Sequence, residues 1–319
     1  MKTQIYLATA RSLNVIEGSN RTWRGEVRLQ DQQVQCVSVG SRLKERVYCG
    51  TFGNGVYRSD DAGATWRPCK GLPNQNVMAL ATADGGDAGR PALLYAGTEP
   101  SAIYQSSDGG DTWHPLPGLL SLTSAGEWSF PPRPETHHVR QILSDPCFPR
   151  RLHVAIEAGA LLRGEDGGET WRDRVPGGPR DTHTLAAHRS APGRLYSAAG
   201  DGYFESLDDG DTWRRVMEGL EHGYCWSVAV SPSDPDTVLL SASKSPRAAH
   251  SKKFLRISLS IGAALMSHGA KLWTVFRIRR AAGCPSSHEM ISSGVCFTWL
   301  RKASFIGQQI AALSGRNSG

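Results

Sequence analysis

The chain has 319 residues, 35 glycines and 18 prolines, a composition that fits one large all-β domain with many turns. Its seven cysteines are odd in number and form no CxxC pair, which argues against a disulfide framework and against a zinc site. The chain has no apolar stretch of membrane-spanning length and starts without the basic and apolar regions of a secretory signal, so we expect a cytoplasmic protein without a membrane partner.

The formal charge of +6 is unevenly distributed. Residues 252–319 hold ten lysines and arginines against one acidic residue, Glu289, and carry +9, whereas residues 1–251 carry −3. A nucleic-acid-binding protein gathers its basic residues on a folded face or a recognised module. Because the larger part of this chain is mildly acidic, we expect no nucleic-acid partner.

Strand-like segments separated by turn residues follow one another from the N-terminus to about residue 242. Residues 4–30 supply a first unit, and further units begin near residues 34, 77, 138, 183 and 226. Four strands can be placed in each complete unit. The sixth unit is incomplete, and one restored C-terminal repeat would bring the total to about seven.

One eight-residue pattern recurs in four of these units, at residues 59–66, 106–113, 164–171 and 206–213. The final tryptophans are 47, 58 and 42 residues apart, a period typical of propellers and solenoids. Aspartate and glycine at fixed places predict a hairpin turn, with the tryptophan packed against a neighbouring unit. The residues expected to have this structural role are Asp61, Gly63, Trp66, Asp108, Gly110, Trp113, Asp166, Gly168, Trp171, Asp208, Gly210 and Trp213.

The pattern matches Ser-x-Asp-x-Gly-x-Thr-Trp, with Gly164 in place of the serine in the third copy. It resembles the Asp-box, also called the BNR repeat, of a superfamily that includes sialidases, sortilin-like sorting receptors and photosystem assembly factors. The resemblance covers residues 30 to 250. It implies an all-β propeller of about six to seven four-stranded antiparallel blades. It also implies that each box joins the third and outermost strands, away from any active site.

The repeat pattern stops at about His250. Residues 251–319 contain no aspartate and no further box, although local pattern and global fold agree in most natural sequences. We therefore divide the chain into a propeller, residues 1–250, and an atypical basic tail, residues 251–319. The tail is either translated out of frame or disordered, or it is a genuine basic extension.

In a propeller, the loops that enter the innermost strands and the loops between second and third strands open on the face opposite the boxes. We expect a ligand site there, for a small polar or sugar-like ligand or for a protein partner of a monomeric propeller. An arginine can pair with a ligand carboxylate, whereas no short-spaced motif supports a metal site among the histidines, and no cofactor is expected. The residues predicted to line the site are His137, His138, Arg140, Asp181, His183, Asp201, Trp226 and Arg247.

The resemblance leaves two classes of function open. The first is a non-catalytic module that binds a ligand or protein on this face. The second is an exo-glycosidase of sialidase type, in which a tyrosine nucleophile is assisted by a glutamate; Glu157 with Tyr203 or Tyr224 could imitate that pair. The N-terminal Arg-Ile-Pro signature of sialidases is absent, which favours the binding module.

Overall fold

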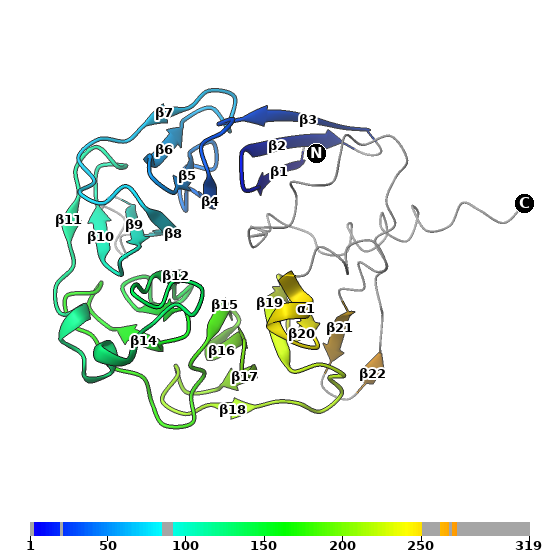
Figure 1. Cartoon of the computed structure of the whole chain (residues 1–319). Coiled ribbons are helices and arrows are strands. Elements are labelled where there is room, and N and C mark those ends of the chain that lie inside the picture. The colour runs from blue at the N-terminus through cyan, green and yellow to red at the C-terminus, as the bar shows by residue number, and fades with distance from the viewer. Residues whose placement is uncertain (1–2, 20–21, 85–91, 251–261, 268–269, 273–319) are drawn as a thin grey trace, which may run out of the picture.

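The computed structural model describes residues 3–19, 22–84, 92–250, 262–267 and 270–272. Over these residues the chain forms six antiparallel sheets arranged one after another around a common centre (Figure 1). The protein is therefore an all-β propeller. The only α-helix of this part of the chain, α1 (Pro246–His250), has five residues and is too short to cross a bilayer.

Each sheet is one blade, and chain order equals order in the sheet. The strands are β1 (Thr3–Ala8), β2 (Leu13–Ser19) and β3 (Thr22–Arg28); β4 (Val34–Val39), β5 (Val47–Thr51), β6 (Gly55–Ser59) and β7 (Arg67–Pro68); β8 (Val77–Ala83), β9 (Leu93–Thr98), β10 (Ile103–Ser106) and β11 (His114–Pro115). They continue with β12 (Val139–Ser144), β13 (Leu152–Ile156) and β14 (Ala160–Gly164); β15 (Thr182–His188), β16 (Ala191–Ala199), β17 (Gly202–Ser206) and β18 (Arg214–Arg215); and β19 (Tyr224–Ser231), β20 (Asp234–Ser243), β21 (Gly262–Ser267) and β22 (Ala270–Leu272). The first strands of successive blades contact one another, which places them innermost in the ring.

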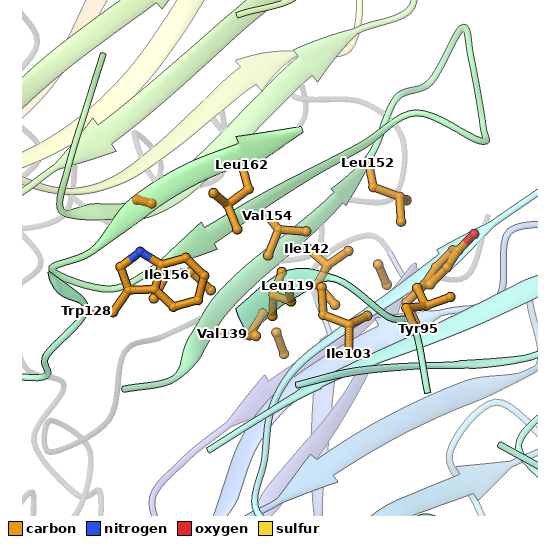
Figure 2. Close-up of a cluster of buried hydrophobic side chains, with 14 of the residues drawn as sticks. Tyr95, Ile103, Leu119, Trp128, Val139, Ile142, Leu152, Val154, Ile156 and Leu162 are labelled. Atoms are coloured by element: carbon orange, nitrogen blue, oxygen red, sulfur yellow. The ribbon is translucent and has the colours of Figure 1, made fainter. Parts of the chain in front are cut away.

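The hydrophobic core lies between adjacent blades. Figure 2 shows one such cluster, in which Tyr95 and Ile103 of the β8–β11 blade meet Val154 and other side chains of the β12–β14 blade. β13 is buried along its whole length because both faces of the blade are covered. Burying an aliphatic side chain of this kind stabilises a fold by about 1.5–3 kcal/mol, so the contacts between blades carry much of the stability.

The recurring pattern forms the turn between the third and fourth strands, which we call the repeat turn. In the first copy the Asp61 carboxylate accepts hydrogen bonds from the Thr65 backbone N–H at 2.9 Å and from the Ser59 hydroxyl at 2.7 Å. The Ser59 Oγ in turn accepts the Gly63 N–H at 2.7 Å. Hydrogen bonds from Thr65 lower the pKa of Asp61 to about 2. The aspartate is thus part of the scaffold, as the pattern predicts.

The residue immediately before each of the first three patterns reaches the repeat turn of the next blade. Arg58 donates to the Gly109 carbonyl at 2.8 Å, and Arg163 donates to the Asp209 carbonyl at 2.7 Å. Gln105 makes a longer contact of 3.5 Å with the Gly167 carbonyl. All three carbonyls belong to the fourth residue of the pattern. We call this contact the inter-blade latch, and it joins three successive pairs of blades.

Two details differ from the sequence expectation. The third copy of the pattern is followed by a single bridge between Arg163 and Arg172 rather than by a fourth strand. Strands β21 and β22 complete the last sheet within the region assigned to the atypical tail. The rest of the tail, residues 251–261, 268–269 and 273–319, lies outside the described residues.

The tight fit of the repeat turn leads to a stability prediction. Gly63 has φ +91°, and a Cβ there would lie 2.9 Å from Tyr6 of the preceding blade. Gly53 has a similar φ of +95°, but nothing lies within 4 Å of a Cβ at that position. Gly53→Ala should lower the free energy of unfolding by about 1–2 kcal/mol, because alanine is strained in the left-handed backbone conformation. Gly63→Ala should lower it by about 1–3 kcal/mol more, because the added methyl group also overpacks the turn. Urea unfolding measures both, and equal losses would contradict close packing of the turn on the first blade.

Candidate functional site

The strand order determines which loops meet at one end of the ring. In an antiparallel blade the start of the first strand and the connection between second and third strands lie at the same end, whereas the repeat turn lies at the other. The starts of β12, β15 and β19 and the connections after β9, β13 and β16 therefore share one face. Most of the site residues expected from the sequence lie on these segments.

His138 is the centre of a buried charged network on this face. Its side chain is 1% exposed, and its ring lies between two glutamates, with Nε2 at 2.8 Å from Glu157 Oε2 and Nδ1 at 3.4 Å from Glu99 Oε2. Arg133 donates two hydrogen bonds to Glu99, at 3.0 and 2.6 Å. A histidine between two carboxylates is stabilised as the imidazolium. With His138 protonated, positive and negative side chains alternate along this network.

The pKa values of this network follow from its contacts. Burial opposes the charged form of His138, but its hydrogen bond to Glu157 and the nearby carboxylate of Glu99 outweigh burial and raise its pKa above 6.5. Burial likewise opposes ionisation of Glu157, yet the charge of Arg140 and the hydrogen bond from His138 lower its pKa to about 2. Glu157 is therefore an ionised carboxylate at neutral pH.

A second group lies beside it, at the starts of β15 and β19. The His183 side chain is 1% exposed. Its Nδ1 atom lies 2.7 Å from the Cys225 carbonyl oxygen. Its Nε2 atom lies 3.6 Å from Asp181 Oδ2 and 3.4 Å from the Tyr224 hydroxyl. Because a carbonyl can only accept, Nδ1 carries the proton and Nε2 has a lone pair. Burial lowers the pKa of His183 and raises that of Asp181.

Arg140 and Trp226 connect the two groups. The Arg140 guanidinium lies over the Trp226 ring at 5.2 Å, and its Nε is 3.4 Å from Glu157 Oε2. The Trp226 ring in turn lies 4.5 Å from the His183 ring. Arg140 remains 21% exposed and its Nε has no hydrogen-bond partner among the described residues. Three blades thus place an arginine, an aromatic wall and several carboxylates together.

The structure brings most predicted residues together but not all. His138, Arg140, Glu157, Asp181, His183, Tyr224 and Trp226 form the cluster described above. His137 lies beside it, with its ring 5.6 Å from that of Trp128. Asp201 accepts the Arg180 N–H at 3.3 Å and adds negative charge near Asp181.

Two candidates lie apart from the cluster. Tyr203 is fully buried in the core between the last two blades, and its hydroxyl donates to Glu205 at 2.9 Å. It is the second residue of β17, and its side chain packs between blades rather than lining the loop. Arg247 is exposed on α1 and makes no hydrogen bond or ion pair with any described residue.

Arg133 is a site residue that the sequence did not single out. It comes from the long connection between β11 and β12, which also contains the 3₁₀ helices η1 (Leu119–Ser121) and η2 (Thr123–Glu127). Besides pairing with Glu99, its guanidinium lies 5.1 Å from the Phe130 ring. The unusual length of that connection was the available signal, because long loops in compact domains are often functional.

A small cavity of about 80 Å³ lies away from this cluster, between β14 and the repeat turn of the next blade. His153 and Arg163 line it, and Arg163 is already paired with Glu165 and Asp211. Burial lowers the pKa of His153 to about 3, so its ring is neutral. We attribute this cavity to the packing of the inter-blade latch.

The chain resembles known proteins in fold rather than in sequence. No family model matches it, and no curated protein matches its sequence. Among solved structures, an ancestral GH74 enzyme has a TM-score of 0.57 at 17% identity over 77% of this chain and 31% of that chain. The GH74 enzyme of Niastella koreensis has a TM-score of 0.55 at 15% identity over 75% and 42%. The chain therefore spans less than half of either enzyme.

A third solved structure is closer in length. YCF48 bound to D1 peptide has a TM-score of 0.51 at 15% identity, and the match covers 76% of this chain and 78% of that chain. At these identities the likeness establishes the β-propeller fold alone.

The raised pKa of His138 leads to a pH prediction. The pKa of His138 is higher in the folded state than its unfolded value of 6.5. The protonated ring therefore stabilises the fold fully below pH 6.5, and this stabilisation is lost as the pH rises through the folded-state pKa. We expect the stability advantage of the wild type over His138→Gln to shrink above pH 6.5. Urea unfolding at several pH values measures this difference, with His222→Gln, at a partly exposed position, as control. An advantage that grows with pH would contradict the imidazolium assignment.

Proposed function

We propose that this protein is a binding module that holds a peptide segment of a protein partner on the face where the inner strands begin. The observation that carries the proposal is the pairing of Arg140 with Trp226. The guanidinium lies against an aromatic ring, and the Arg140 side chain remains 21% exposed. Such an arginine is suited to receive a ligand carboxylate.

The surroundings of Arg140 suit a peptide. Trp226 supplies partly exposed ring surface, and the carboxylates of Glu157 and Asp181 can accept peptide N–H groups. In the matched YCF48 structure, of which this chain covers 78%, that protein is bound to D1 peptide. The hydrogen bonding of the four repeat turns supports placing the chain among the Asp-box propellers, which include non-catalytic members.

An array of peptides with free C-termini would test this proposal. Arg140→Ala should weaken the peptides that bind by about tenfold or more, because a hydrogen bond between charged groups is worth about 1.5–3 kcal/mol. Amidating the C-terminus, or replacing an acidic side chain of the peptide, should remove the same contribution. Fluorescence anisotropy measures the affinity, and Arg67→Ala, an exposed arginine at a repeat turn, is the matched control.

Two outcomes would contradict the binding proposal. One is an array on which no peptide binds the folded wild-type protein. The other is a set of peptides whose affinity does not change in Arg140→Ala. Circular dichroism of each variant keeps a loss of binding distinct from a loss of folding.

A second candidate function, glycoside hydrolysis, is favoured by one observation. Burial raises the pKa of Asp181, whereas Arg140 and His138 lower that of Glu157 despite its burial, and such opposite shifts suit an acid and a base. The sialidase version with a tyrosine nucleophile is less favoured, because burial and nearby carboxylates raise the pKa of Tyr224 and disfavour the phenolate. Turnover on a panel of fluorogenic glycosides that Asp181→Asn and Glu157→Gln abolish would establish the enzyme.

A further inference from the structure

Three potential metal ligands converge at the junction of two blades. Glu157 follows β13, Asp181 immediately precedes β15 and His183 lies within β15, and one ligand atom from each lies within 4.8 Å of the others. His183 Nε2 and Asp181 Oδ2 are 3.6 Å apart. Two ligand atoms at about 2.1 Å from one first-row metal ion are separated by about 3–4 Å. Small side-chain rotations would bring the set into that range.

Each of the three side chains is already held by a contact behind it. His183 Nδ1–H donates to the Cys225 carbonyl, which leaves the Nε2 lone pair near Asp181 Oδ2 at 3.6 Å and the Tyr224 hydroxyl at 3.4 Å. Asp181 Oδ1 accepts the Ala158 N–H at 2.9 Å, which leaves Oδ2 available. Glu157 Oε2 contacts His138, which leaves Oε1 available. Metal ligands in proteins are oriented by outer contacts of this kind.

The charge around the cluster also favours a cation. Four carboxylates meet on this face, those of Glu99, Glu157, Asp181 and Asp201. Three cationic side chains face them, those of Arg133, Arg140 and His138. In addition, Asp201 Oδ1 is buried and has no hydrogen-bond partner among the described residues. The negative charge that these cations leave uncompensated lies on the side of Asp181 and Asp201, where a buried carboxylate oxygen without a partner is costly.

We propose that Glu157, Asp181 and His183 bind a divalent first-row metal ion such as Zn²⁺, with a coordination position left open toward solvent. One imidazole and two carboxylates are ligands that Zn²⁺ accepts. The open position follows from exposure, because the Asp181 side chain is 29% exposed whereas that of His183 is 1% exposed. This proposal goes beyond peptide binding and does not depend on it.

Calorimetric titration of the tag-free, chelator-treated full chain with Zn²⁺ tests the proposal. We expect one ion per chain, and we expect Glu157→Gln, Asp181→Asn and His183→Gln each to raise the dissociation constant at least about tenfold. Glu221→Gln and His222→Gln are matched controls, because Glu221 is exposed, His222 is partly exposed, and both immediately precede the β19 region. Circular dichroism and thermal unfolding confirm that each variant is folded.

Arg140→Gln separates this proposal from the proposed function. Its guanidinium lies beside Glu157 and opposes a metal ion there, so removing the charge should tighten Zn²⁺ binding severalfold while weakening peptide binding. The absence of saturable Zn²⁺ binding, or binding that the three ligand variants leave unchanged, would overturn the metal site. Binding of methylammonium in place of Zn²⁺ would also overturn it and would assign the cluster to an amine.

Discussion

The inter-blade latch is the interaction on which the arrangement of this propeller depends. A long polar side chain at the end of a third strand donates to a backbone carbonyl in the repeat turn of the following blade, as Arg58 does to Gly109. The accepting turn is rigid because its own aspartate already receives several hydrogen bonds, such as those from Thr112 to Asp108. The latch therefore joins one rigid element to another, whereas the apolar contacts between blades could slide.

The position of the latch has consequences at the opposite end of the ring. Arg163 links the β12–β14 blade to the β15–β18 blade, and the same two blades meet at the other end through the Ala158 N–H and Asp181 Oδ1. Glu157 and His183 lie on either side of that hydrogen bond. A shift of one blade along the other would separate them, so the scaffold at one end determines the chemistry at the other.

The buried charges of the site are costly to stability. Taking ions out of water has a penalty of several kcal/mol that even a good ion pair only partly offsets. Here the network of Arg133, Glu99, His138 and Glu157 is arranged with alternating sign, which limits that cost. We interpret its retention as a device that orients Glu157 and holds it ionised.

Much of the fold could be predicted from the sequence, because one pattern of eight residues determines a turn, and its period determines the blades. The phase of the repeat also predicted which loops share a face. It therefore predicted that His138, Asp181 and Trp226, which lie on or beside those loops, share that face. Side-chain direction within a strand was harder to predict: Tyr203 begins a strand near the site but faces the core between blades. Arg133 was missed because its connection belongs to no repeat. The latch could have been found from Arg58, Gln105 and Arg163, which precede the pattern at one fixed position.

Hydrogen exchange of the Ala158 amide is the measurement that tests the central role of the latch most directly. Arg163→Met removes the latch between two blades and keeps most of the side-chain volume. We expect faster exchange at Ala158, whose N–H bonds to Asp181 across the same pair of blades, and unchanged exchange at Cys49 in β5 of a distant blade. Unchanged protection of Ala158 in this variant would contradict the central role of the latch.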